Sequence, residues 1–448
     1  MIKLIRAIRK NYFDNTVDLS KLSKTFLLWG AGLVMVYIAN IYLTRLIGLE
    51  KYGEYVVFIN WAVLISALVT FGWDGYLVQK LPQLPVNADG KIEIGTTFKR
   101  ASYSFIILYT VLVIILLMAV YFFDLSFLFS GAGTLLIFLL LIFFFTWINY
   151  FKSVLKILHK VTPVQWVEDF SKPLLLLIVL GYFYYFNFTL SLTTVYQVNV
   201  LLFFGVVVSL YLLIHYTTKK KFTLKQSNPQ TEKWVSQCFY FMCIMLGYGF
   251  FSKMELLFLG YYTKHEDAAK YQILLRIADL VILPDFLFNY YLPQKFSHYF
   301  SENNYAEAGK LFRNASKTIF FLQVLCLAGV AGIGYFYLQS FQIAGLEIYL
   351  LLLILCSSQL FYSLFGSANL VLMTSGNEKY SFRALGMVLF AEGIANVIFI
   401  PAYGLAAAIY ISWCSVLLYT VILYYFVHKK LQFNSPLTEW LTNAAKSK

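Results

Sequence analysis

Charged residues are scarce in this chain: Asp, Glu, Lys and Arg make up only 13% of its 448 residues. A soluble globular protein usually carries about 25% charged residues. By contrast, 60% of the residues are hydrophobic and the mean hydropathy is +0.70. This balance excludes an ordinary soluble protein and predicts an all-α integral membrane protein that crosses the bilayer many times.

Motifs of catalytic and metal sites are also absent. The sequence has no glycine-rich phosphate loop, no HExxH and no CxxC, and its five histidines show no triad-like pattern with Ser or Asp. Its five cysteines lie in or beside apolar runs without ligand spacing, which is typical of small hydrophobic packing residues. We therefore expect no enzyme, no metal site and no cofactor. A membrane-embedded glycan-processing enzyme is the weaker alternative, because it would need acidic or histidine-rich catalytic loops.

Long apolar runs dominate what is present. The first run is too long for a signal-peptide core and has no small-residue cleavage site, so we interpret it as an uncleaved first span. A transmembrane helix needs about 20 apolar residues. The twelve predicted spans are 25–47, 54–78, 101–123, 126–151, 163–186, 192–216, 233–262, 271–294, 315–338, 346–372, 380–400 and 402–426.

Positive charge is concentrated on one predicted side of the membrane. That side has 28 of the 35 Lys and Arg residues, whereas the opposite loops have only Lys51, Lys264 and Lys270. Lys and Arg accumulate in cytoplasmic loops. The bias therefore predicts that both termini are cytoplasmic and supports an even number of spans. The formal net charge of +13 reflects this topology rather than binding to nucleic acid.

An internal repeat indicates two halves. Gly30 and Gly32 in the first predicted span recur as Gly247 and Gly249 in the seventh, 217 residues later. This spacing predicts two six-helix bundles related by a pseudo-two-fold axis along the membrane normal. The predicted parts are a basic N-terminal tail (1–24), an N-lobe (25–216), a linker (217–232), a C-lobe (233–426) and a C-terminal tail (427–448).

Residues that weaken helices stand at matched places in the two predicted lobes. Such positions are where alternating-access carriers bend. The candidate hinges are Gly30, Gly32, Gly247, Gly249 and Pro284. Close packing of small residues is the alternative explanation for the glycines.

Several ionisable residues fall inside the predicted spans, where a charge is costly and usually functional. We expect Lys253 and Arg276 to line a hydrated central cavity that a polar cargo crosses. The candidate acids for binding a coupling proton or sodium ion, or for lining the cavity, are Asp74, Asp285, Glu392 and Asp279.

Structural ion pairs are the alternative for some of these charges. Arg276 and Asp279 are three residues apart, and Glu168 and Lys172 are four apart, so each pair could simply neutralise itself on one helix face. The acids at positions 74, 285 and 392 could equally serve as plain hydrogen-bonding groups.

Three stretches, taken in their order and spacing, resemble Wzx-type polysaccharide flippases of the MOP superfamily, whose fold is MATE-like. The stretches are GLEKYGEY (48–55) followed by FGWD (71–74), AKYQILLRIA (269–278) with LP (283–284), and NVIFIPAYGLAAA (396–408). The resemblance implies two six-helix bundles around a central cavity. It also implies translocation of a polyprenyl-diphosphate-linked oligosaccharide, such as an O-antigen, capsule or exopolysaccharide repeat unit, from the cytoplasmic to the outer leaflet of the bacterial cytoplasmic membrane. In this family cavity cations attend the anionic head group, which Arg276 and Lys253 match by position.

Two related functions stay open at this point. A drug or cation antiporter of the same fold would need a mainly acidic or aromatic cavity. A flippase for lipid-linked peptidoglycan precursors usually carries two additional helices. The partners implied by the resemblance are the lipid-linked oligosaccharide, membrane lipids and the glycan polymerase machinery, with H+ or Na+ as the coupling ion.

Overall fold

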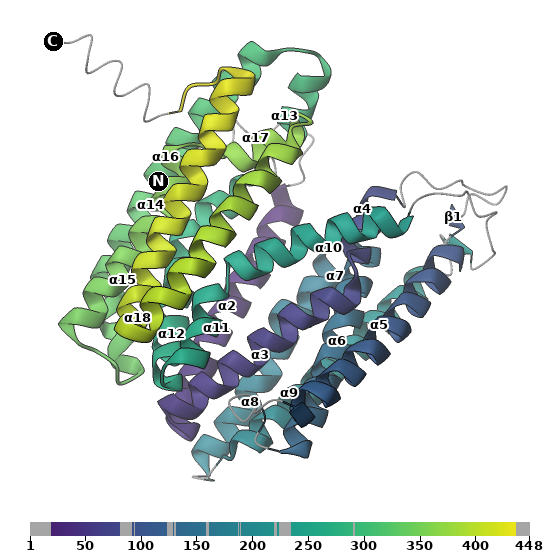
Figure 1. Ribbon diagram of the computed structural model, residues 1–448, viewed down its shortest axis with the longest axis vertical. Helices are drawn as coiled ribbons and strands as arrows, with labels where there is room; N and C mark the ends of the chain where they lie inside the picture. The colour runs from purple at the N-terminus through teal and green to yellow at the C-terminus, as the bar shows by residue number, and fades with distance from the viewer. Residues whose placement is uncertain are drawn as a thin grey trace. The chain divides into compact units, whose positions relative to one another are not determined.

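Figure 1 shows the computed structural model, which describes residues 19–80, 92–93, 95–122, 129, 131–157, 161–186, 188, 190–218, 222–223, 234–289 and 292–435. Most of these residues are helical, and the described β-structure is a short parallel pairing of β1 (Ile92–Glu93) with β2 (Phe222–Thr223). Within the described part, nine helices are long and apolar enough to cross a membrane. The predicted all-α, multi-pass membrane fold is confirmed, and the exact count of twelve spans stays a prediction.

The chain divides into two compact units. The N-terminal unit covers Leu19–Lys253, and the C-terminal unit begins at Met254. This division falls inside the predicted seventh span, which is interrupted at Ser252 and Lys253. The predicted linker, 217–232, lies almost wholly outside the described residues, so the predicted lobe boundaries stay a prediction.

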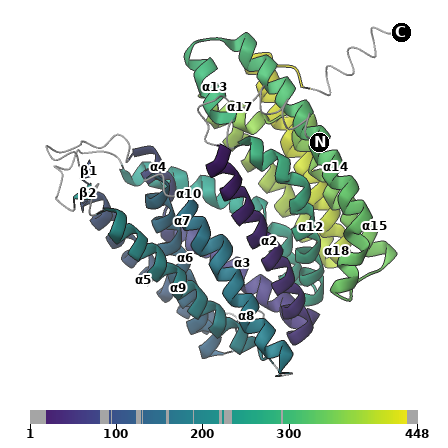
Figure 2. The ribbon, with the colours of Figure 1, turned by 180° about the vertical axis from the view of Figure 1, so that it is seen from behind.

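The N-terminal unit is built around α6, which lies between α3 and α9 (Figures 1 and 2). Its core is aromatic: the rings of Phe58 and Tyr196 stack at 4.3 Å, and Phe138 packs edge-on against Phe58 at 5.0 Å. The elements are α2 (Leu19–Ile47), α3 (Leu49–Thr70), α4 (Trp73–Lys80), α5 (Gly95–Phe122), α6 (Ala132–Ile157), α7 (Val161–Gln165), the π-helix η2 (Trp166–Ser171), α8 (Lys172–Tyr185), α9 (Leu192–Thr218) and α10 (Trp234–Phe251).

The predicted span 54–78 is two helices rather than one. The chain turns between α3 and α4 at Phe71 and Gly72, which both have positive φ, 52° and 70°. A side chain at Gly72 would overlap the carbonyl oxygen of Cys238 on α10. The glycine is therefore required both for the turn and for the close approach of α10.

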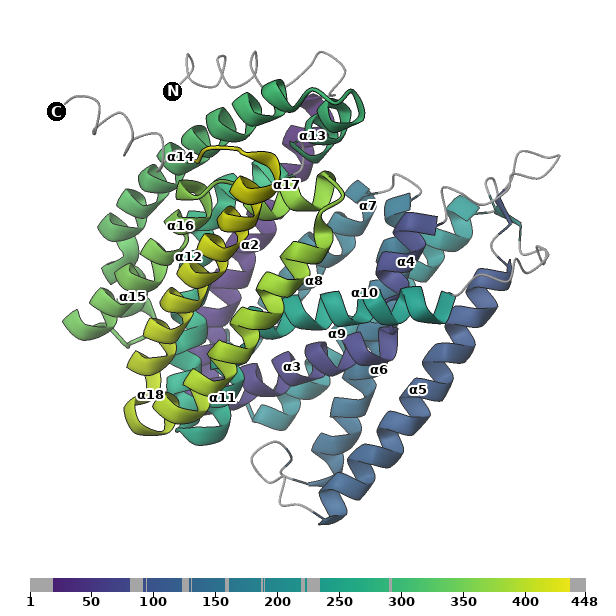
Figure 3. The same cartoon turned by 45° about the horizontal axis from the view of Figure 1, so that its top comes forward.

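The C-terminal unit is organised around the long helix α18, which contacts α11, α15 and α17. Figure 3 shows α18 folding back on itself to form two neighbouring arms. The elements are α11 (Met254–Tyr262), α12 (His265–Asn289), α13 (Leu292–Ser301), α14 (Tyr305–Ser340), α15 (Leu346–Ser358), α16 (Leu360–Leu364), α17 (Ala368–Thr374) and α18 (Glu378–Leu431).

The corner of α18 is at Gly404, whose φ of 54° and ψ of −131° are not helical. It follows Pro401 and coincides with the junction predicted between the last two spans. We call residues 378–403 the first arm and residues 405–431 the second arm. The backbone angles at the corner lie in a region that only glycine enters without strain.

Replacing Gly404 with Ala should lower the thermal unfolding midpoint of the purified protein. The strain is about 1–3 kcal/mol, and the new methyl group would lie 3.2 Å from Oδ2 of Asp267. Gly386→Ala is the matched control, because Gly386 is in the same helix with nothing within 4 Å of an added Cβ. An equal midpoint for the two variants would contradict a strained corner.

Candidate functional site

Two buried carboxyl groups meet in the C-terminal unit. Glu255 is the second residue of α11, and Glu392 is on the first arm of α18; each is only 2% exposed. The two helices pack closely: a Cβ atom added to Gly393 of α18 would lie 3.9 Å from the Sδ atom of Met254 in α11. Because burying an ionised carboxylate is costly without a compensating partner, this pair demands a specific chemical environment.

A chain of hydrogen bonds supplies part of that environment. The side chain of Glu255 is in hydrogen-bonding contact with those of Glu392 and Tyr271, and Tyr271 is in hydrogen-bonding contact with Ser412. Ionised carboxylates only accept hydrogen bonds. The contact between Glu255 and Glu392 therefore requires a proton on one of them, and among the described residues no N–H or O–H group donates to Glu392.

Further buried polar atoms lie on the helices that carry Glu392 and Tyr271. Asn396 is fully buried one turn after Glu392, and neither atom of its amide has a hydrogen-bond partner among the described residues. Gln272, beside Tyr271 on α12, also keeps a buried Oε1 atom without a partner there. Carboxylate and amide oxygens are the donors that protons and hard cations prefer. The residues present therefore fit a site that exchanges H+ or Na+.

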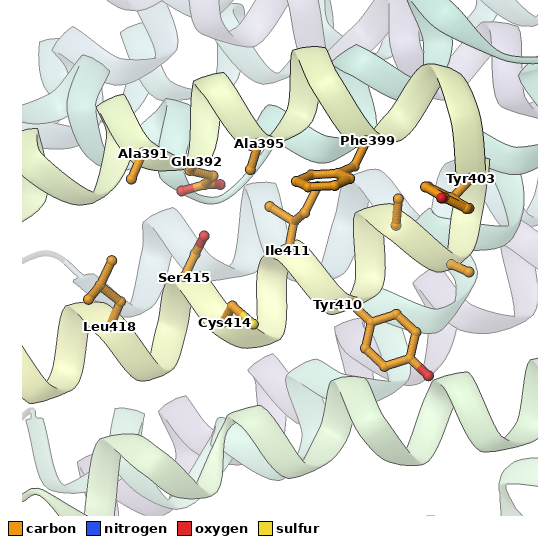
Figure 4. Close-up of a pocket in the computed structure, with 12 residues that line it drawn as sticks. Ala391, Glu392, Ala395, Phe399, Tyr403, Tyr410, Ile411, Cys414, Ser415 and Leu418 are labelled. Carbon is orange, nitrogen blue, oxygen red and sulfur yellow. The ribbon is translucent and has the colours of Figure 1, made fainter.

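Glu392 also forms part of the wall of a cavity of about 530 Å³ between the two arms of α18 (Figure 4). In this view Glu392 and Ser415 point toward one another from opposite arms. The rest of the lining is mainly apolar and aromatic, with Phe399 and Tyr403 near the corner of the helix and Tyr410 on the second arm. The cavity connects one member of the carboxyl pair with the surface of the unit.

The predicted cation Arg276 lies on α12 beside Asp279. Its Nη1 atom is 4.0 Å from Oδ2 of Asp279, and the two side chains are 39% and 47% exposed. A partly exposed pair at this distance contributes little, about 0–1 kcal/mol. Asp285 is buried on the same helix, which continues through Pro284 without a break. Neither Asp279 nor Asp285 is part of the carboxyl pair.

The other predicted residues lie in the N-terminal unit. Lys253 is the last residue of this unit and is half-buried in the turn after α10. Asp74 is half-buried on α4. Since Lys253 and Arg276 belong to different units, a cavity that they share stays a prediction.

Gly247 and Gly249 are inside α10, and the helix ends after Phe251. The break in the seventh span is thus later than the two candidate hinge glycines.

Glu168 forms an ion pair with Lys152 of α6, with 2.8 Å between Nζ and Oε2. The pair that the sequence predicts between Glu168 and Lys172 stays a prediction. The ammonium of Lys172 lies 4.1 Å from the ring centroid of Phe203. Glu168 lies in η2, whose wider turn changes the face on which residues four apart lie.

Substitutions at Gly32 and Gly30 can distinguish a packing role from a bending role in the first span. A methyl group at Gly32 would overlap the carbonyl oxygen of Asp169 in η2, whereas one at Gly30 would meet nothing within 4 Å. We expect Gly32→Ala to lower the thermal midpoint, by about 1–3 kcal/mol of stability, and Gly30→Ala to leave it unchanged. If both variants lose transport at an unchanged midpoint, bending rather than packing explains these glycines.

Sequence reasoning identified Glu392 but missed its partners. It treated 233–262 as one continuous span, and the turn at Ser252 removes that assumption. The available signal was the i,i+4 spacing of Glu392 and Asn396 in an apolar helix, which puts both on one face.

No protein-family model and no curated protein matches this chain. Among solved structures, it is similar to a multidrug resistance MATE family transporter of the MOP superfamily in an inward-facing conformation, with 10% identity, a TM-score of 0.67 and coverage of 91% of this chain and 98% of that chain. It is also similar to the lipid II flippase MurJ in an inward closed conformation, with 15% identity, a TM-score of 0.65 and coverage of 95% and 89%. The outward-facing MATE structure matches at 13% identity with a TM-score of 0.63, over 92% of this chain and 95% of that chain.

These likenesses show that the chain has the fold shared by MATE transporters and MurJ. The fold expected from the sequence is therefore confirmed. The similar proteins are described as transporters and a flippase, and the expectation that this chain is not an enzyme stays a prediction.

Proposed function

We propose that this protein is an ion-coupled flippase that moves a polyprenyl-diphosphate-linked oligosaccharide from the cytoplasmic to the outer leaflet of the bacterial cytoplasmic membrane, with both termini in the cytoplasm. The observation that carries the proposal is the buried carboxyl pair of Glu255 and Glu392 within a transporter fold. A pair that must hold a proton or a cation changes its charge when that ion leaves. Such a change biases one conformation over another, which is what coupling requires.

The cargo assignment is supported by Arg276. It stands in the stretch of α12 that resembles Wzx-type flippases, and its guanidinium is a planar fork whose geometry suits phosphate oxygens. A diphosphate brings at least two negative charges into a poorly solvating region. Cationic partners offset that cost, and Lys253 is the second candidate for this role.

A multidrug or cation antiporter is the second candidate function, and a peptidoglycan-precursor flippase the third. MATE transporters and MurJ match the fold about equally well. The acid pair alone would suit a cation antiporter, whereas Arg276 favours an anionic cargo.

Purified protein in vesicles distinguishes these functions. A fluorescent undecaprenyl-diphosphate oligosaccharide in one leaflet should become accessible to a membrane-impermeant quencher or glycosidase on the other side. A lipid-linked peptidoglycan precursor and an organic cation, assayed in parallel, should move no faster than in protein-free vesicles. Faster movement of either comparison substrate than of the oligosaccharide would contradict the proposed cargo.

A further inference from the structure

Positive side chains gather where the two ends of α18 meet. Three of them surround the ring of Tyr380: Nζ of Lys379 is 5.3 Å from its centroid, Cζ of Arg383 is 5.8 Å away and Nζ of Lys430 is 5.1 Å away. Lys379 and Arg383 belong to the first arm and Lys430 to the second. The fold at Gly404 therefore brings residues from opposite ends of one helix to a common ring. We call Lys379, Tyr380, Arg383 and Lys430 the basic cluster.

The basic cluster has no acidic partner in the described part of the chain. Its three cations are exposed, and none forms an ion pair there. Glu378, the neighbouring acid, forms none either. Three like charges around one ring repel one another, and the attraction of each to the ring face offsets only part of that repulsion. An anion bound among them would remove it.

Apolar surface adjoins the cations. The ring of Tyr380 packs on that of Phe426 at 5.0 Å, which fixes the centre of the cluster on both arms. The two arms also carry exposed hydrophobic side chains: Phe382 and Phe390 on the first arm and Tyr425 on the second. A ligand with a negative head and a hydrocarbon tail can contact both surfaces, whereas a free anion contacts only the first.

The position of the basic cluster also fits a lipid headgroup. It lies at the end of the C-terminal unit that carries α13 and α17 (Figures 1 and 2). The loops at this end belong to the side that the charge bias predicts to be cytoplasmic. Basic pockets between helices on that side attract anionic lipid headgroups.

We propose that the basic cluster binds the phosphate of an anionic phospholipid of the cytoplasmic leaflet, with the acyl chains along the exposed apolar side chains of α18. This site lies apart from the buried carboxyl pair and does not depend on the identity of the cargo. Arg383 holds the phosphate oxygens with its planar fork, and the two lysines act as point charges on either side.

The test is a titration of the full-length detergent-purified protein, followed by native mass spectrometry. The probes are short-chain phosphatidylglycerol, phosphatidylcholine, undecaprenyl diphosphate and inorganic phosphate. We expect the wild type to retain phosphatidylglycerol preferentially. The variant Lys379→Gln/Arg383→Gln/Lys430→Gln should bind it about a hundredfold more weakly, and Lys430→Gln alone about fivefold more weakly, if each cation contributes equally.

The matched control is Lys295→Gln/Lys310→Gln/Lys317→Gln, which removes the same charge from the same unit outside the basic cluster. It should bind phosphatidylglycerol like the wild type. Equal weakening by both triple variants, or by neither, would overturn the proposal. Inorganic phosphate bound as tightly as phosphatidylglycerol would also overturn it, because that result indicates an adventitious ion only. A third contrary result is that the basic cluster retains undecaprenyl diphosphate but not phosphatidylglycerol. If the triple variant does not insert into the membrane, Lys430→Gln alone is the test. A fivefold loss of phosphatidylglycerol affinity supports the proposal, and an unchanged affinity overturns it.

Discussion

Replacing Glu392 with Gln should reduce transport at least tenfold while the protein inserts and folds normally. The amide has nearly the shape of the carboxyl group and its NH2 can donate a hydrogen bond to Glu255, so we expect the contact between α11 and α18 to survive. It cannot release a proton or ligate a cation as a carboxylate does. The loss therefore reports ion exchange rather than packing. The measurement is the rate of cargo movement in vesicles, with the thermal midpoint as the measure of folding.

Glu378→Gln is the matched control for this experiment. It makes the same chemical change on the same helix, at an exposed residue that forms no ion pair among the described residues. We expect it to transport at the wild-type rate. Unimpaired transport by Glu392→Gln would show that the buried pair is a structural hydrogen bond and that coupling has another origin.

Replacing Arg276 with Ala should reduce translocation of the diphosphate-linked cargo by about ten- to a hundredfold, the equivalent of one charge-assisted interaction of 1.5–3 kcal/mol. Arg276→Lys should keep part of the activity, because it preserves the charge and loses only the planar fork. Lys270→Ala is the control: this residue is also on α12, and its Nζ lies 3.8 Å from Oδ1 of Asp267. Its loss should leave translocation near the wild-type rate.

The double variant Arg276→Ala/Asp279→Ala separates cargo binding from structure. If Arg276 binds cargo, removing Asp279 as well leaves translocation low. Transport restored in the double variant would mean that the single variant failed because it stranded a carboxylate, and that Arg276 has a structural role only.

The apolar runs were sufficient to predict the helical membrane fold, because few soluble structures tolerate so little charge. They were not sufficient to predict where helices break. Phe71 has a positive φ that its residue type does not signal, and the π-helix η2 arises in a stretch with no glycine. By contrast, the corner at Gly404 was readable, since a proline and a glycine mark it together.

The candidate site was predictable only in part. Glu392 stood out as a charge in an apolar span, but its partner depends on how α11 rotates after the turn at Lys253. Tyr271 and Ser412 are ordinary residues until folding aligns their hydroxyls with Glu255. The proposed shared cavity of Lys253 and Arg276 depends on how the two units are placed, and transport measurements on variants of these residues test it.

The most direct test of the central claim is to impose an ion gradient and follow the cargo. Vesicles that contain the wild type or Glu255→Gln/Glu392→Gln receive an inward gradient of H+ or of Na+, and the rate of oligosaccharide-lipid movement is compared with the rate at zero gradient. The account predicts that one of the two gradients accelerates the wild type and that neither changes the double variant. Cargo movement by the wild type at the same rate with and without either gradient would contradict it.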